Sequence, residues 1–222
     1  MTEVRVYNAF TGPANWANDG AAANDGISVG MEFRVSAPAW ATKLWFWRAN
    51  TDGDSNIRRG GIYRLSDGAL LTPDTSFGAV GTLGAWNSVS LATPLALTTY
   101  DGTDATRYMV VIYHPGGGFT FTQNVMTADR TVGILTAPAS GSAKYGSNTY
   151  RESPNTLSLP TDTFNSSRYW LDVSVDDTAP ASPGRPVKVW NGSTWQTKTL
   201  KTWNGSAWVA KPTKTWNGSS WA

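Results

Sequence analysis

The chain has 222 residues, of which 18 are Lys or Arg, 16 are Asp or Glu, one is His and none is Cys. The missing Cys excludes disulfides, thiol nucleophiles and Cys-ligated zinc, and a single His excludes a His-clustered metal site. Charged residues make up only 15% of the chain, which contains 22 Gly and 12 Pro, and this turn-rich composition is typical of all-β proteins rather than helical enzymes.

The N-terminus predicts neither export nor a membrane anchor. Its first residues are charged, and no apolar core of roughly 7–15 residues follows them, so we expect no secretory signal. The longest apolar run, residues 108–113, has six residues, whereas a membrane helix needs about 20. We therefore expect a soluble protein that is made in the cytoplasm and does not insert into a membrane.

Short runs that read as strands recur between turn signals in the first 176 residues. In one of them Leu44 and Phe46 point to one face, while Trp45 and Trp47 point to the other. Strands with period 2 must bury one face against a second layer, so two packed antiparallel sheets are expected. The runs are residues 29–35, 42–48, 61–65, 69–71, 86–91, 108–113 and 169–175.

Several of these runs carry a family resemblance. The segments are ISVGMEF (27–33), KLWFWR (43–48), GIY (61–63), SDGALL (66–71), WNSVSLATPL (86–95), RYMVVIYHPGGGF (107–119) and YWLDV (169–173). In order and spacing, residues 27–175 resemble an uncharacterised β-sandwich domain family of bacterial surface proteins and phage structural proteins. The resemblance implies a jelly-roll-like sandwich, usually beside sugar-binding or adhesive modules, and no established activity. Residues 50–59 form a longer and more charged stretch than the family pattern leads us to expect.

The composition changes after the predicted sandwich. Residues 178–222 contain six basic residues and no acidic one, and six of the twelve Trp lie in the last 33 residues. We therefore divide the chain into a sandwich domain with an N-terminal arm (1–176), a Pro-rich linker (177–187) and a repeat segment (188–222).

The C-terminal segment is a threefold repeat with a period of 13 residues. The copies are KVWNGSTW (188–195), KTWNGSAW (201–208) and KTWNGSSW (214–221). Asn-Gly is the strongest short hairpin signal, and a two-residue type I′ turn at Asn191 and Gly192 would place Trp190 opposite Ser193. Trp195 would then lie diagonal to Trp190, within reach of Lys188. These repeats resemble those that end minor tail proteins of actinobacterial phages.

The repeats predict an interface. A lone hairpin is marginally stable in water, and a repeat unit cannot bury its own apolar face, so the segment must pack on other chains or dock. We expect self-association, preferably as a trimer, and contacts with other virion structural proteins. The Lys residues are regularly spaced rather than clustered, so we expect no nucleic-acid partner. The anchoring residues are Trp190, Trp195, Trp203, Trp208, Trp216, Trp221, Lys188, Lys201 and Lys214.

Aromatic side chains in the sandwich are candidates for contact with a host glycan. They are Trp45, Trp47, Trp86, Tyr145 and Tyr150. Exposed aromatic rings form apolar patches of the kind that mark interfaces. The alternative is that the N-terminal arm or a neighbouring subunit covers them.

Two polar motifs read as structural. His114 before three Gly has no Gly-x-Ser-x-Gly partner, so a strand end followed by a turn is expected rather than an esterase loop. Asp52, Asp54 and Asn56 begin like a calcium loop, but Ile57 stands where Gly is needed and no Glu follows at position twelve. We expect a solvated loop without metal.

These features predict a non-enzymatic virion protein without cofactor or metal. The sequence favours a minor tail protein, assembled in the host cytoplasm, whose sandwich contacts a host-envelope glycan. The alternatives are a purely architectural capsid or tail decoration protein and a carbohydrate-binding module of a bacterial surface protein.

Overall fold

The computed structural model describes residues 3–7, 17–18, 26–152, 156–178, 187–198 and 200–211. Within this part of the chain the strands pair antiparallel, and the helical content is a single 3-10 turn, η1 (Asp104–Thr106). The expected all-β class is therefore confirmed. Among the described residues, no helix is long and apolar enough to cross a membrane. The chain forms two compact units, Met1–Thr178 and Ala179–Ala222, which are described separately.

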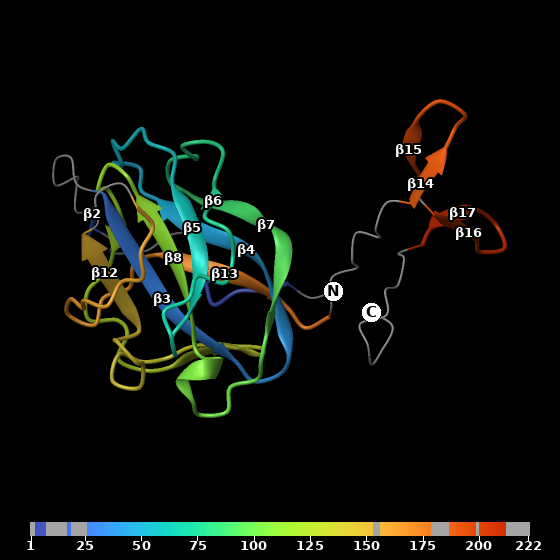
Figure 1. Cartoon of the computed structure of the whole chain (residues 1–222). Helices are drawn as coiled ribbons and strands as arrows, with labels where there is room; N and C mark the ends of the chain where they lie inside the picture. The colour runs from blue at the N-terminus through green and yellow to red at the C-terminus, as the bar shows by residue number, and fades with distance from the viewer. Residues whose placement is uncertain are drawn as a thin grey trace. The chain divides into compact units, whose positions relative to one another are not determined.

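The first unit contains two antiparallel sheets (Figure 1). The smaller sheet has the order β1 (Glu3–Val4), β13 (Leu171–Asp176), β4 (Ala39–Arg48), β7 (Ala85–Leu97). The larger has the order β10 (Arg130–Val132), β11 (Leu135–Ala137), β3 (Ile27–Val35), β8 (Tyr108–His114), β5 (Arg59–Arg64), β6 (Thr75–Ser76), and β12 (Asn148–Glu152) also pairs with β3. A further pair joins β2 (Ala17–Asn18) to β9 (Thr120–Phe121).

The core lies between the two sheets. Leu44 and Phe46 of β4 point into it, as the alternation predicts, and are at most 1% exposed. Val110 and Ile112 of β8 belong to the same buried cluster. Burying side chains of this size stabilises the fold by roughly 1.5–3 kcal/mol each, so this cluster holds the two sheets against each other.

Strand β8 is buried on both faces. Its even-numbered residues face the smaller sheet, whereas Met109, Val111 and Tyr113 form a second cluster that includes Leu157. This double burial explains the continuous apolar run at residues 108–113. Gly30 on the neighbouring strand has to be small, because a Cβ there would lie 2.6 Å from the Met109 sulfur and 2.7 Å from Pro160.

Strand boundaries differ from the expectation at several places. β4 and β7 are longer than predicted, and residues 69–71 contribute only a bridge between Leu70 and Tyr63. β12 was not expected, because its sequence NTYRE is polar, yet it pairs along residues 27–31 of β3.

The described residues of the second unit form two hairpins, β14 (Val187–Trp190) with β15 (Trp195–Lys198) and β16 (Lys201–Trp203) with β17 (Trp208–Ala210). The first two of the three predicted hairpins are confirmed, but the predicted two-residue turn is wrong. Trp190 lies opposite Trp195, so four residues form the loop, and Gly192 takes a φ of +99°. The Asn191 side chain closes the loop by accepting hydrogen bonds from the Ser193 and Thr194 amides.

This register also changes the position of the lysines. Lys188 pairs with Thr197, and among the described residues no cation–π contact joins it to Trp195. Lys201 likewise pairs with Ala210 in the second hairpin. The third repeat, with Lys214, Trp216 and Trp221, and most of the linker lie outside the described residues.

Candidate functional site

An aromatic pocket of about 220 Å³ lies at the margin of the core. Tyr150 and Glu152 are alternate residues of β12 and therefore project to the same side, next to Ile27 of β3. The other lining residues come from β9, from the segment before it and from the approach to β13. The lining residues are Ile27, Phe119, Phe121, Tyr150, Glu152, Phe164 and Tyr169.

The rings around this pocket are tilted against one another. Phe119 and Tyr169 lie 5.4 Å apart at 70°, and Phe121 and Phe164 lie 6.3 Å apart at 69°. Tyr150 meets Tyr169 at 64°. These edge-to-face angles hold the rings as walls on several sides rather than as one flat platform.

The pocket has one charged side chain. Glu152 is exposed, and it forms no ion pair within the described residues. Phe164 is also exposed, at 43% of its surface. A ligand entering here would meet apolar rings and one uncompensated negative charge.

The other predicted aromatics of the sandwich lie elsewhere. Trp45, Trp47 and Trp86 lie on the outer face of the smaller sheet, with the Trp47 and Trp86 rings 5.8 Å apart. Trp47 is only 9% exposed. Tyr145 packs outside the larger sheet, against the second buried cluster. The structure thus places only Tyr150 of the five candidates in the pocket.

The N-terminal segment covers part of the tryptophan face. The Arg5 guanidinium lies 3.7 Å from the Trp45 ring centre and 4.8 Å from that of Trp86. Its Nε is 3.3 Å from a carboxylate oxygen of Asp172, which also accepts hydrogen bonds from the Val6 and Tyr7 amides. Residues 3–7 therefore cover Trp45 and Trp86. This is the alternative that the sequence raised, in which the N-terminal arm covers the aromatic side chains.

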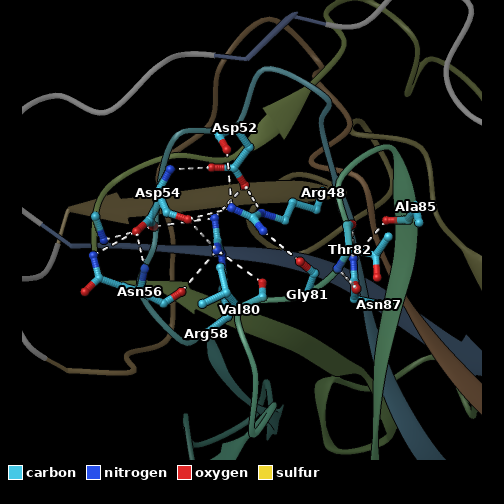
Figure 2. A network of polar contacts seen from close by, with 11 residues as sticks. Arg48, Asp52, Asp54, Asn56, Arg58, Val80, Gly81, Thr82, Ala85 and Asn87 are labelled. Carbon is cyan, nitrogen blue, oxygen red and sulfur yellow. Dashed lines mark hydrogen bonds and ion pairs between the residues drawn. The ribbon is translucent and has the colours of Figure 1, made fainter.

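The acidic loop after β4 is solvated only in part: Gly53 and residues 55–57 are exposed, as expected, but the two carboxylates are buried. Asp52 and Asp54 are each 8% exposed, and they share the fully buried guanidinium of Arg58 (Figure 2). Arg58 Nη2 lies 2.5 Å from Asp52 and 3.5 Å from Asp54. The Arg58 guanidinium therefore balances the charge of these carboxylates. No cluster suited to a metal ion occurs among the described residues.

This polar network, made of Arg48, Asp52, Asp54 and Arg58, joins three loops. Arg48 donates to the Gly81 and Asp54 carbonyls (Figure 2). The Asp54 carboxylate also accepts a hydrogen bond from the Gly116 amide. Burial raises the pKa of Asp54, but hydrogen bonds from Asn56 and the Arg58 charge outweigh it and hold the pKa below its usual value. The network is a structural clamp made of already partnered charges.

His114 is the last residue of β8, as expected, and is fully buried beside this network. Neither ring nitrogen has a hydrogen-bond partner of ordinary geometry in the described part of the chain. Burial, with the nearby Arg58 charge, lowers the pKa of His114 to about 3. The ring is therefore neutral at physiological pH, and its nearest ring contact is Phe46, edge-on at 5.9 Å.

The hairpins present the most exposed aromatic surface of the described residues. Trp190 and Trp195 pack together at 5.6 Å, and Trp203 with Trp208 at 5.8 Å, but all four remain between 51% and 65% exposed. Lys188 and Lys201 are exposed as well. Each hairpin thus repeats the same surface, as the sequence repeat predicts.

Sequence reasoning missed most of the pocket. Phe119 and Phe121 have the period-2 spacing that indicates a shared face, and this signal was available. Phe164 and Tyr169 carry no local signal, because their approach to β12 depends on how the loop before β13 folds. Arg5 and Arg58 were likewise not expected as partners, although Arg58 stands only four residues after Asp54.

Comparison with known proteins supports the uncharacterised domain family. A family model described as "Domain of unknown function (DUF4082)" matches residues 11–171, a span that ends before the repeats. No curated protein shows a significant match to the chain. Because the family model covers more than half of the sequence, the chain belongs to the DUF4082 family.

Proposed function

We propose that this protein is a structural, non-catalytic component of a bacteriophage virion, a minor tail protein. Its sandwich contacts the host envelope, and its Trp repeats join copies of the chain and anchor them among other virion proteins. The likeness of the repeats to the ends of actinophage tail proteins supports this assignment, whereas the domain family of the first unit has no known function.

The observation that carries the proposal is the exposure of the hairpin tryptophans. Among the described residues, these four Trp pack in two pairs, and each residue remains more than half exposed. Apolar surface of this kind is stabilised by burial at roughly 25 cal/mol per Å². Association of several identical tails buries it, and the resulting avidity strengthens weak individual contacts of the sandwich.

Light scattering after size exclusion tests the role of the tail. The full chain should elute with the mass of a trimer, whereas a chain that ends at Thr178 should be monomeric. A full-length variant with Trp190, Trp195, Trp203 and Trp208 changed to Thr keeps the length and should lose most of the association. Equal masses for the full and shortened chains would rule out tail-driven assembly.

A second measurement separates host contact from pure decoration. Labelled full-length protein is incubated with host cell envelopes and sedimented. Retention that falls when pocket residue Tyr150 is changed to Leu, but not when Tyr145 is, supports an envelope-binding sandwich. If the natural full-length chain does not sediment with the envelopes either, the result would favour an architectural decoration protein.

A further inference from the structure

We propose that the aromatic pocket between β9 and β12 binds a quaternary ammonium group, of which choline is the simplest example. The inference deepens the proposed host contact, on which it rests, by naming the group that the sandwich recognises. It concerns the seven lining residues of the pocket and is independent of the role proposed for the tail.

The composition of the lining argues against a sugar ring as the occupant. Five of the seven side chains are aromatic and one is Ile27, so the polar side-chain groups are two phenolic hydroxyls and the Glu152 carboxylate. A pyranose carries several hydroxyls, and each one that loses water without a new partner costs about 1–3 kcal/mol. A quaternary ammonium has no N–H donor that would be left without a partner, and the aromatic faces and the Glu152 carboxylate offset the loss of water around its charge.

The ring geometry points the same way. Sugars stack on a flat face, whereas the rings here meet at 42° to 70° and line an open pocket of about 220 Å³. A methylated cation inside such walls contacts aromatic surface from several directions. Each ring within about 6 Å of the cation contributes roughly 0.5–2 kcal/mol, depending on how far the site is desolvated.

Charge completes the match. Glu152 lies on the same face of β12 as Tyr150, and within the described residues no basic side chain neutralises it. The exposed Phe164 ring leaves the pocket open to a group carried on a larger molecule. The site therefore combines an aromatic box with one carboxylate, which is the chemistry that holds a choline head.

Titration of the full-length protein with choline chloride, followed by NMR of backbone amides, tests the inference. Shifts should concentrate at residues 119–121, 150–152 and 164. The neutral isostere 3,3-dimethyl-1-butanol should bind about tenfold more weakly, since a tenfold ratio corresponds to about 1.4 kcal/mol, within the range of a cation–π contribution. Equal affinity for both compounds, or shifts produced by glucose and not by choline, would overturn it.

Variants locate the effect in the pocket. Phe164→Leu keeps the apolar bulk but removes a ring, and Glu152→Gln removes the charge, so each should weaken choline binding several-fold. Glu152→Gln should leave the neutral isostere unaffected. Tyr145→Leu, an aromatic residue outside the pocket, is the matched control and should bind choline like the natural chain. Unchanged affinity in both pocket variants would exclude this site.

The group occurs at cell surfaces both as a lipid head and as a phosphocholine substituent on polymers. Co-sedimentation with phosphatidylcholine vesicles tests the first source, and capture on a soluble phosphocholine–polymer conjugate tests the second. Retention on either identifies the source, and retention on neither contradicts the inference. A protein that ignores choline but forms trimers and binds envelopes keeps the proposed function and loses only this assignment.

Discussion

Asp172 is a fully buried carboxylic acid that holds the N-terminal segment against the smaller sheet. Burial raises its pKa to about 6, although the Arg5 charge and the amides of Tyr7, Val173 and Val6 favour the ionised form. His114 shows the opposite case for a base, because burial lowers its pKa to about 3. Between pH 4 and 6 these two residues change the folding free energy in opposite directions.

The sign follows from which state binds the proton more tightly. For Asp172 it is the folded state, so its contribution to stability is fully present below the unfolded pKa of 3.8 and is lost as pH rises through about 6. For His114 it is the unfolded state, so its contribution is lost as pH falls from 6.5 toward 3. Replacing Asp172 removes its pH-dependent contribution to stability and leaves that of His114.

Asp172→Asn should therefore make stability rise more steeply with pH between about 4 and 6. Urea unfolding at several pH values in this range measures the slope, independently of any overall loss of stability in the variant. Asp67→Asn is the control, because the Arg64 hydrogen bond lowers the pKa of Asp67 to about 2 and it titrates below this window. A slope identical to that of the natural chain would show that Asp172 does not hold its proton in the folded protein.

The hairpin loop has its own stabilising device. Asn191 Oδ1 accepts hydrogen bonds from the Ser193 amide, the Ser193 hydroxyl and the Thr194 amide, at 2.8 to 3.1 Å. Asn204 makes the same three contacts in the second hairpin. Gly192 and Gly205 supply the positive φ that this loop requires.

Asn191→Ala should unfold the first hairpin and leave the second intact. Each hydrogen bond contributes about 0.5–1.5 kcal/mol, and an isolated hairpin has no larger margin of stability. Indole N–H shifts of Trp190 and Trp195 should move toward unfolded values in NMR spectra, while those of Trp203 and Trp208 stay. Asn204→Ala should give the reverse pattern. Spectra that change in both hairpins, or in neither, would contradict independent loops.

The local pattern of apolar residues predicts a strand correctly where a single periodicity of side chains dominates the segment. Alternation at residues 42–48 assigned Leu44 and Phe46 to the core, and the continuous run at 108–113 identified the central strand β8. β12 could not be read this way, because its buried residues are Asn148 and Thr149, polar groups held by partners distant in sequence. The repeats predicted hairpins, but the loop length depends on the Asn side chain rather than on the Asn-Gly pair alone.

The candidate pocket was largely outside the reach of sequence reasoning for the same reason. Its lining comes from segments around residues 27, 120, 151 and 164–169, and only the folded sheets bring them together. Tyr150 was a candidate from its residue type alone. The acidic loop was misjudged because the sequence does not show that Arg48 and Arg58 turn inward and bury its carboxylates.

At the scale of the whole molecule, the two units differ in charge and in how they are stabilised. The sandwich has its own core, drawn from residues of the first unit, and the polar network and the Arg5–Asp172 pair also lie within Met1–Thr178. The segment after it carries only basic charges, whereas all 16 acidic residues precede it. This asymmetry offers an electrostatic alternative to tail association, namely docking of the tail on an acidic sandwich.

Stability of the shortened chain distinguishes these arrangements. If the sandwich is stable without the tail, a chain that ends at Thr178 should unfold in urea at the same midpoint as the first unit of the full protein. The two free energies of unfolding should agree within about 0.5 kcal/mol, because removing a segment that does not contact the sandwich does not change the stability of the sandwich. If the tail docks on the sandwich, the full chain gains stability from that binding, and the gain shrinks with added salt because exposed charges are screened. A salt-dependent difference between the two midpoints would therefore contradict a tail that contacts only other copies of the chain. Equal midpoints are the result expected if the tail tryptophans contact other chains.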